Sequence, residues 1–272
     1  MPTLAQVLRG ADNDAMCLSA LAWNVHPRWR LLLIGNRDEF HARPTAPLAR
    51  WATAPGGSQV LAGRDLQSGG TWLGIDQRGR CAVVNNFRAP QALVQTGTSR
   101  GSLPLGFLSG TQSARRHARE VLAAAPRYSP FNLLLVDQNQ CMHIGNHPAA
   151  EARSLAPGLH GISNGGLDLP WPKTRKLGAA LESWLDSRSE DPAPLWRALA
   201  DETMPADDEL PDTGVGLELE RLLSPAFIRG HTYGTRASTL VAIDHDGCGW
   251  ISERRFGPDR VFEGERTLHM ER

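Results

Sequence analysis

The chain has 272 residues, of which 41% are hydrophobic and 21% charged, so it is an ordinary globular protein with length for one large domain or two small ones. Its 29 basic and 29 acidic side chains give a formal net charge of zero, which leaves no electrostatic case for nucleic acid or an anionic membrane as partner. No run approaches the roughly 20 apolar residues of a membrane helix. Residues 1–15 lack the basic start and apolar centre of a secretory signal.

The cysteines and lysines are few and say little about function by themselves. No C-x-x-C pair occurs, so a zinc knuckle or a thioredoxin-type motif is not indicated, and a chain of this length does not need disulfides. We therefore expect a reducing, cytoplasmic compartment. Lysine occurs only at Lys173 and Lys176, which we interpret as a compositional bias toward arginine rather than as anion recognition. The widely spaced cysteines are Cys17, Cys81, Cys141 and Cys248.

The first half of the chain is rich in predicted strands. Short apolar runs bounded by turn residues predict strands over 17–23, 30–35, 59–63, 71–76 and 80–86. The first two strands are expected to form a hairpin that opens the domain. Residues 87–112 look loop-rich, and a helix is predicted over 113–125, with Ser113 as its cap.

The second half alternates between strands and helices without a regular β-α-β pattern. Strands are predicted over 131–137, 140–144 and 158–164, and the clearest helix over 173–187, followed by helical turns at 195–200. An acidic loop is expected at 201–216 and a short helix at 217–223. Three strands then end the chain, at 237–244, 249–254 and 266–270. This order predicts one α+β domain in which helices cover antiparallel sheets.

The dipeptide Met16-Cys17 offers a possible nucleophile. A cysteine attacks as its thiolate and therefore needs a base or a positive neighbour. If Met16 is removed, the free α-amine of Cys17, with a reference pKa of about 7.7 to 8, can serve as base for its own side chain, as in enzymes with an N-terminal threonine. Taken alone, the dipeptide is weak evidence, because a buried strand cysteine explains it more simply.

The segment 36–40, Asn-Arg-Asp-Glu-Phe, is too polar and charged for a core strand, so we predict that it leaves the second strand as a loop. Because a hairpin sets its strands side by side, this cluster is expected near the sheet end that bears Cys17. Arg37 would then lower the thiol pKa, and Asp38 would accept a hydrogen bond from the α-ammonium. The alternative is a surface cluster of ion pairs.

Further polar residues follow or precede apolar strands. Asn85 and Asn86 end one strand, Asn164 ends another, and Arg236 lies just ahead of the strand predicted at 237–244. Strand-end asparagines are common turn formers. They are also fixed amide donors suited to an oxyanion hole, where one donor contributes about 3 kcal/mol.

Five motifs in order resemble the NRDE family, whose eukaryotic members are named for transport and Golgi organisation. The motifs are NRDEF, GGTWLGI (69–75), VNNF (84–87), GISN with a following PWPK (161–164 and 170–173), and YGTR (233–236). The resemblance covers about residues 16–272. The family is similar to the cysteine-type N-terminal-nucleophile hydrolases, which implies a four-layer αββα sandwich.

The same resemblance implies site roles. Cys17 would be the nucleophile with Arg37 and Asp38 as its neighbours, Asn86 and Asn164 would bind the oxyanion or substrate, and Arg236 would stabilise charge. The choices of Asp38 over Glu39 and of Asn86 over Asn85 stay open.

The function expected from this resemblance is hydrolysis of a non-peptide C–N amide in a small-molecule substrate, without metal or cofactor. The alternative is a carrier of haem or acyl-lipid on the same fold, without turnover. In either case residues 17–272 would form a single domain. Residues 1–16 would be a leader or a misassigned start that is absent from the working protein.

Overall fold

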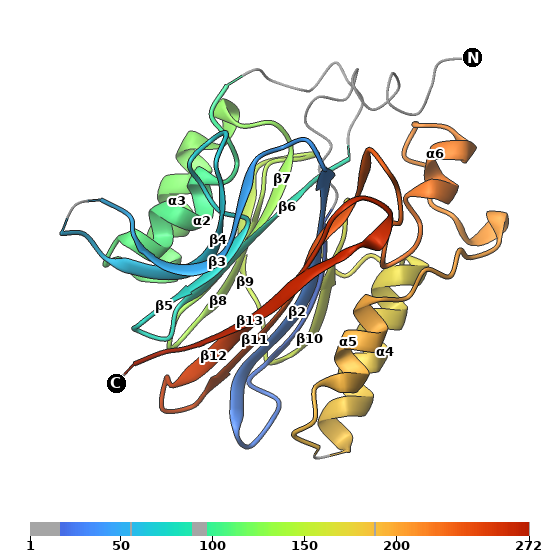
Figure 1. The fold of residues 1–272 in the computed structure, drawn as a ribbon. Coiled ribbons are helices and arrows are strands. Elements are labelled where there is room, and N and C mark those ends of the chain that lie inside the picture. Colours follow the sequence, from blue (N-terminus) through green and yellow to red (C-terminus); the bar gives the residue numbers. More distant parts are fainter. Residues whose placement is uncertain (1–16, 55, 89–96, 188, 272) are drawn as a thin grey trace.

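The computed structural model describes residues 17–54, 56–88, 97–187 and 189–271. Two antiparallel sheets face each other, and helices cover the outer face of each sheet (Figure 1). This arrangement is the four-layer αββα sandwich that the motifs imply. The expectation about residues 1–16 lies outside the described part of the chain.

The first sheet has six strands in the order β10-β1-β2-β11-β12-β13. The predicted opening hairpin is confirmed: β1 pairs antiparallel with β2, with Cys17 opposite Arg37. The strands are β1 (Cys17–Trp23), β2 (Trp29–Phe40), β10 (Gly158–Ile162), β11 (Tyr233–Asp244), β12 (Gly249–Phe256) and β13 (Phe262–His269).

The second sheet has seven strands, which follow one another in chain order from β3 to β9. The strands are β3 (Thr45–Ala52), β4 (Gln59–Asp65), β5 (Leu73–Asp76), β6 (Cys81–Asn86), β7 (Phe131–Val136), β8 (Cys141–Gly145) and β9 (Glu151–Ser154).

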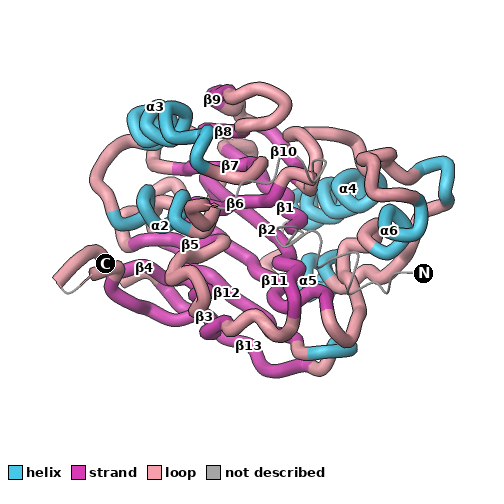
Figure 2. The backbone as a smooth tube through the Cα atoms, turned by 90° about the horizontal axis from the view of Figure 1, so that it is seen from above, coloured by secondary structure: helices cyan, strands magenta, loops and turns pink. Residues whose placement is uncertain are grey.

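The helices divide between the two outer faces, as Figure 2 shows from above. The second sheet is covered by α2 (Ser102–Ser109) and α3 (Ala114–Ala124), and the first by α4 (Pro172–Asp186) and α5 (Ala193–Leu199). The short α6 (Leu217–Leu222) lies beyond α4. Within the described ranges, no helix is long and apolar enough to cross a membrane.

Side chains alternate along β1 because successive residues of a strand point to opposite faces. Leu21 and Trp23 join the core between the two sheets, whereas Leu18, Ala20 and Ala22 pack under α4 and α5. The amphipathic stripe of α4 completes that second core. Cys17 shares the parity of Leu21, so its side chain faces the space between the sheets.

The prediction that segment 36–40 forms a loop is wrong. β2 continues to Phe40, and Asn36, Arg37, Asp38 and Glu39 are all buried. The segment stays in the sheet because its polar groups find partners inside the fold. The side-chain amide of Asn36, for example, donates to two backbone carbonyl oxygens, at 2.8 and 2.7 Å. A buried polar group with such partners avoids most of its desolvation cost.

Several other boundaries also differ from the predictions. The stretch predicted as loop-rich contains α2, whose buried Leu103, Phe107 and Leu108 are interrupted in the sequence by Pro104 and Gly106. The strands β3 and β9 were not predicted, since few of their side chains are buried. The loop 201–216 contains one short 3₁₀ turn, Asp207–Glu209.

We predict that Gly63→Ala destabilises the fold and that Gly178→Ala does not. A Cβ at Gly63 would lie 2.2 Å from Cη2 of Trp72, a buried ring on which Arg37 stacks at 4.4 Å. Overpacking of this kind costs about 1 to 3 kcal/mol. Gly178 in α4 has no such neighbour within 4 Å, so alanine there gains helix propensity. Chemical denaturation measures both; equal stabilities for the two variants would contradict the packing described.

Candidate active site

Cys17 is the first residue of β1, and its side chain opens onto a cavity of about 650 Å³ at the end of the two sheets. The two sheets and the loops that follow β4 and precede α2 contribute to its walls. The lining is mixed in polarity: it includes Trp72 and Val84, hydroxyl groups, and the charged side chains of Arg37, Glu39, Arg43, Asp65 and Arg100.

The alternation along β2 sends its charged residues to two different sites. Arg37 and Glu39 point between the sheets and line the cavity with Cys17. Asp38 points to the opposite face, toward β11 and α4, where the Thr235 hydroxyl donates a hydrogen bond to its Oδ1. Asp38 and Glu39, between which the sequence left the choice open, therefore lie on opposite faces of the sheet. Glu39 is a cavity residue, and Asp38 lies beneath the start of β1.

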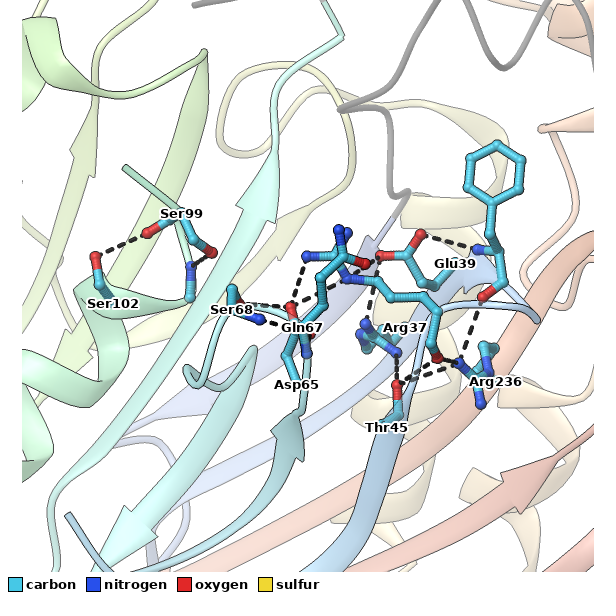
Figure 3. Close-up of polar contacts among 12 residues, drawn as sticks. Arg37, Glu39, Thr45, Asp65, Gln67, Ser68, Ser99, Ser102 and Arg236 are labelled. Atoms are coloured by element: carbon cyan, nitrogen blue, oxygen red, sulfur yellow. Dashed lines mark hydrogen bonds and ion pairs between the residues drawn. The ribbon is translucent and has the colours of Figure 1, made fainter. Parts of the chain in front are cut away.

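Arg37 is held firmly at the cavity wall. Its Nη2 lies 3.3 Å from Oε2 of Glu39, its Nη1 donates to Oγ1 of Thr45 at 3.3 Å, and its guanidinium stacks 4.4 Å from the centroid of Trp72. Figure 3 shows the contacts of Arg37 with Glu39 and Thr45. With both ionic and aromatic partners, Arg37 presents a fixed positive charge beside the Cys17 thiol.

Burial dominates the chemistry of Cys17 in this chain. Removal from water raises the pKa of its thiol to about 12, the charges of Asp38 and Glu39 add to the rise, and Arg37 opposes it. The thiol is therefore protonated at neutral pH and is a weak nucleophile without a base. Among the described residues that line the cavity, none is a histidine.

Asp38 is itself an unusual carboxyl group. It is 1% exposed, and burial raises its pKa to about 7, with Lys173, the hydroxyl of Thr235 and Arg37 opposing the rise. Its second oxygen, Oδ2, has no hydrogen-bond partner among the described residues. A buried carboxylate oxygen of this kind is a ready acceptor for a cationic donor.

The two asparagines at the end of β6 point to opposite faces of the second sheet. Asn85 points between the sheets to Ser19, with Oγ and Oδ1 3.4 Å apart, whereas Asn86 shares the parity of Val84 and lines the cavity beside it. Asn164 does not line the cavity. It supports the end of β6 instead, because its Nδ2 donates to the backbone oxygen of Asn86 at 3.0 Å and its own backbone oxygen accepts from the Arg88 amide at 2.7 Å.

Arg236 does not reach the main cavity either. It lies within β11, at a bulge, and not ahead of the strand as predicted. Its guanidinium donates to the backbone oxygens of Phe40 and Arg43 and to Oγ1 of Thr45, the hydroxyl that also contacts Arg37 (Figure 3). The structure therefore places Arg236 behind Arg37, where it fixes the turn after β2.

Sequence reasoning missed two buried groups at this site. Lys173, in the PWPK motif, is 5% exposed and lies under the same end of the sheet as Asp38 and Cys17. Glu253, on β12, lies behind Arg37 and Trp72 in a small separate cavity of about 30 Å³. The rarity of lysine was the one available signal for the first. The second gave no such signal, because Glu253 stands between Ser252 and Arg254 in the sequence. Among the described residues, no cluster of three or more His, Cys, Asp or Glu could hold a metal ion.

Comparisons with known proteins identify the family and the fold. The sequence profile of the family described as Transport and Golgi organisation 2 matches residues 16–258. The chain belongs to this family. It is 30% identical to the Transport and Golgi organization protein 2 homolog of Bos taurus, over 93% of this chain and 98% of that protein. The Homo sapiens homolog is also 30% identical, over 88% of this chain and 92% of that protein.

A solved structure supports the fold independently of sequence. A variant of conjugated bile acid hydrolase from Clostridium perfringens superimposes with a TM-score of 0.54, covers 93% of this chain and 92% of its own, and is 9% identical. The αββα sandwich of this family member is thus the N-terminal-nucleophile hydrolase fold.

We predict that Glu253→Gln changes how stability depends on pH. Burial raises the pKa of Glu253 from 4.5 to about 7, while its Oε1 accepts from the Leu48 amide at 2.8 Å. The folded protein thus holds a proton that the unfolded chain releases, so stability from this group is complete below about pH 4.5 and is lost as pH rises through about 7. Glutamine mimics the protonated form. Relative to wild type, the variant should gain about 2 kcal/mol more at about pH 8 than at about pH 5.

Urea unfolding at both pH values measures this difference. Glu265→Gln on the outer strand β13, where the carboxylate pairs with Arg254 at 2.9 Å, is the matched control and should show no such change. An equal stability difference at the two pH values for Glu253→Gln would contradict the assignment.

Proposed function

We propose that the protein is an N-terminal-nucleophile hydrolase that cleaves a non-peptide C–N amide bond, with Cys17 as its first residue and nucleophile. The proposal rests on two neighbouring features: Cys17 lies at the start of β1 on the cavity wall, and Oδ2 of the buried Asp38 has no hydrogen-bond partner among the described residues. When Cys17 begins the chain, its α-ammonium supplies the cationic donor that this oxygen lacks.

The same α-amine supplies the missing base. The Cys17 thiol is kept protonated by burial, and the described cavity wall offers no histidine. A free α-amine has a reference pKa of about 7.7 to 8, so at neutral pH a useful fraction of it can accept the thiol proton. Arg37 then stabilises the thiolate that is formed.

The reaction proceeds in two steps. The sulfur of Cys17 attacks the carbonyl carbon while the thiol proton moves to the α-amine, and the resulting oxyanion accepts a hydrogen bond from Asn86. The α-ammonium returns the proton to the leaving nitrogen, the C–N bond breaks, and a thioester remains on Cys17. Water then attacks the thioester, releasing the acyl group as a carboxylic acid and restoring the thiol. Asn164 supports this chemistry by holding the backbone of Asn86.

The cavity favours a polar substrate of modest size. Its volume of about 650 Å³ suits a small-molecule ligand, and its hydroxyls and paired charges offer hydrogen bonds at many points. A haem carrier would need an iron ligand, and Cys17 is the single residue in the described lining with a side chain of the type that commonly holds haem iron. The same cysteine would serve both functions, so we put hydrolysis forward on Asp38, whose buried Oδ2, unpartnered among the described residues, suits an α-ammonium.

We predict that Cys17→Ala lowers turnover of a panel of N-acyl aminocoumarin amides at least about 1000-fold, because the attacking atom is removed. The loss should come in kcat, and the thermal unfolding midpoint should stay close to that of wild type. Fluorescence of released aminocoumarin measures the rate, and intact mass measures the acyl group trapped on the protein.

Cys248→Ala provides the matched control. This half-buried cysteine lies between β11 and β12, outside the cavity lining, so its loss should leave turnover unchanged. Full activity in Cys17→Ala would overturn the proposed function, as would an acyl adduct found on a cysteine other than Cys17.

A further inference from the structure

The strand β6 ends at the cavity, and the residues that follow it stay inside the fold. Asn86 is the last residue of β6 and lines the cavity, and Arg88, two residues later, is buried. The backbone amide of Arg88 donates to the backbone oxygen of Asn164 at 2.7 Å. The side-chain amide of Asn164 in turn donates to the backbone oxygen of Asn86 at 3.0 Å. Asn86 and Arg88 are therefore bound to the same residue, just beyond β10 of the facing sheet.

The side chain of Arg88 forms a buried ion pair with α6. Its Nη1 donates to Oε2 of Glu220 and, at 3.3 Å, to the hydroxyl oxygen of Thr213. The other carboxylate oxygen of Glu220 accepts from the backbone amide of Thr213 at 2.8 Å and from its hydroxyl. Arg88 and Glu220 are only 5% and 4% exposed, so water contributes little to stabilising either charge. Each charge of the pair therefore depends on the other.

This pair joins the end of β6 to the helical layer on the other side of the molecule. Neither Arg88 nor Glu220 belongs to the described lining of the cavity, so neither contacts a substrate bound there. Arg88 is nevertheless only two residues from Asn86 and shares Asn164 with it. An influence of the pair on the site therefore passes through the backbone that carries Asn86.

A buried guanidinium that loses its carboxylate partner is destabilised, because its desolvation is no longer offset. Arg88 could regain water only by moving its side chain out from under α6. Its backbone amide belongs to the same residue, so the hydrogen bond to Asn164 would weaken. Asn164 would then hold the backbone of Asn86 less firmly.

We propose that Glu220 is a positioning residue for Asn86: its ion pair with Arg88 fixes the end of β6, and so holds the side-chain amide of Asn86 at the cavity wall. This inference rests on the proposed function, in which Asn86 donates to the oxyanion, and adds to it the buried pair that fixes that donor. The requirement is geometric, because a donor is effective only at about 2.7–3.1 Å from the oxyanion.

The first measurement is the side-chain ¹⁵N–¹H₂ signal pair of Asn86, recorded on the full protein purified from its own host and assigned as the pair missing from Asn86→Asp. Glu220→Gln removes the negative charge and keeps the size of the side chain. The Asn86 signals should shift or broaden in this variant, because the end of β6 is no longer fixed. Asn86 signals at their wild-type positions in folded Glu220→Gln would overturn the inference. This measurement needs no substrate, so its result does not depend on the hydrolase proposal.

The second measurement is aminocoumarin release, well below the unfolding midpoint of each variant. Glu220→Gln should lower kcat about 10- to 100-fold and change KM less than about 3-fold, since the donor is displaced and the cavity walls are retained. In an Asn86→Ala background the same substitution should lower kcat less than about 2-fold, because no donor is left to position. Equal losses of kcat in the two backgrounds would overturn the inference. They would leave the hydrolase proposal standing, because that proposal falls only if Cys17 is dispensable.

Glu218→Gln is the matched control, because Glu218 is an exposed carboxylate on the same helix. It should leave the Asn86 signals, kcat and KM at their wild-type values, and a change equal to that of Glu220→Gln would contradict the inference. If Glu220→Gln does not fold, Glu220→Asp serves both measurements, since it keeps the charge and withdraws the carboxylate from Arg88 by one methylene group. Wild-type Asn86 signals and wild-type kcat in folded Glu220→Asp would then overturn the inference.

Discussion

The structure depends on the burial of the polar end of β2. Four consecutive residues, Asn36 to Glu39, lie inside the sandwich, and removing one partner from a buried charge pair costs about 3 to 5 kcal/mol. Strand alternation offsets this cost because it directs the four side chains to partners on both faces of the sheet. Arg37 and Glu39 pair with each other between the sheets, and Asn36 and Asp38 find partners on the helix side.

The same alternation separates the residues that line the cavity from the residues on the helix side of the first sheet. The space between the sheets holds the cavity, with the Cys17 thiol and the positive charge of Arg37. The helix side holds Asp38, which is buried and bonded to Thr235 of β11, and the buried Lys173 of α4. Cys17 lies beside the charged residues of β2 because it begins β1 directly opposite Arg37. Its thiol faces the cavity, and in the working form that we propose its backbone nitrogen is the α-amine that Asp38 would hold.

Much of this architecture was predictable from sequence, and the failures have physical causes. The apolar runs predicted the opening hairpin and α4 because burial leaves a clear periodicity. The NRDEF segment was assigned to a loop because local polarity cannot reveal partners as distant along the chain as Leu199 and Thr235. The family motifs pointed to Cys17, Arg37, Asp38 and Asn86 as candidates for the site. They did not separate the residues that line the cavity from those, such as Asn164 and Arg236, that support its walls.

Lys173 illustrates the same limit. Its scarcity in an arginine-rich chain was visible, but its burial follows from the close approach of α4 to β10, which only the folded structure reveals. A lysine at the start of a helix ordinarily extends into solvent. Here it shares the low-dielectric layer that makes the pKa of Asp38 and the thiol of Cys17 depend on their neighbours.

The central claim is that Cys17 is the first residue of the working protein. Intact mass with N-terminal sequencing of the protein made in its own host tests this most directly. The account predicts a chain that begins at Cys17 with a free α-amine. A chain that retains Met1 or Pro2 and still hydrolyses amides through Cys17 would contradict it.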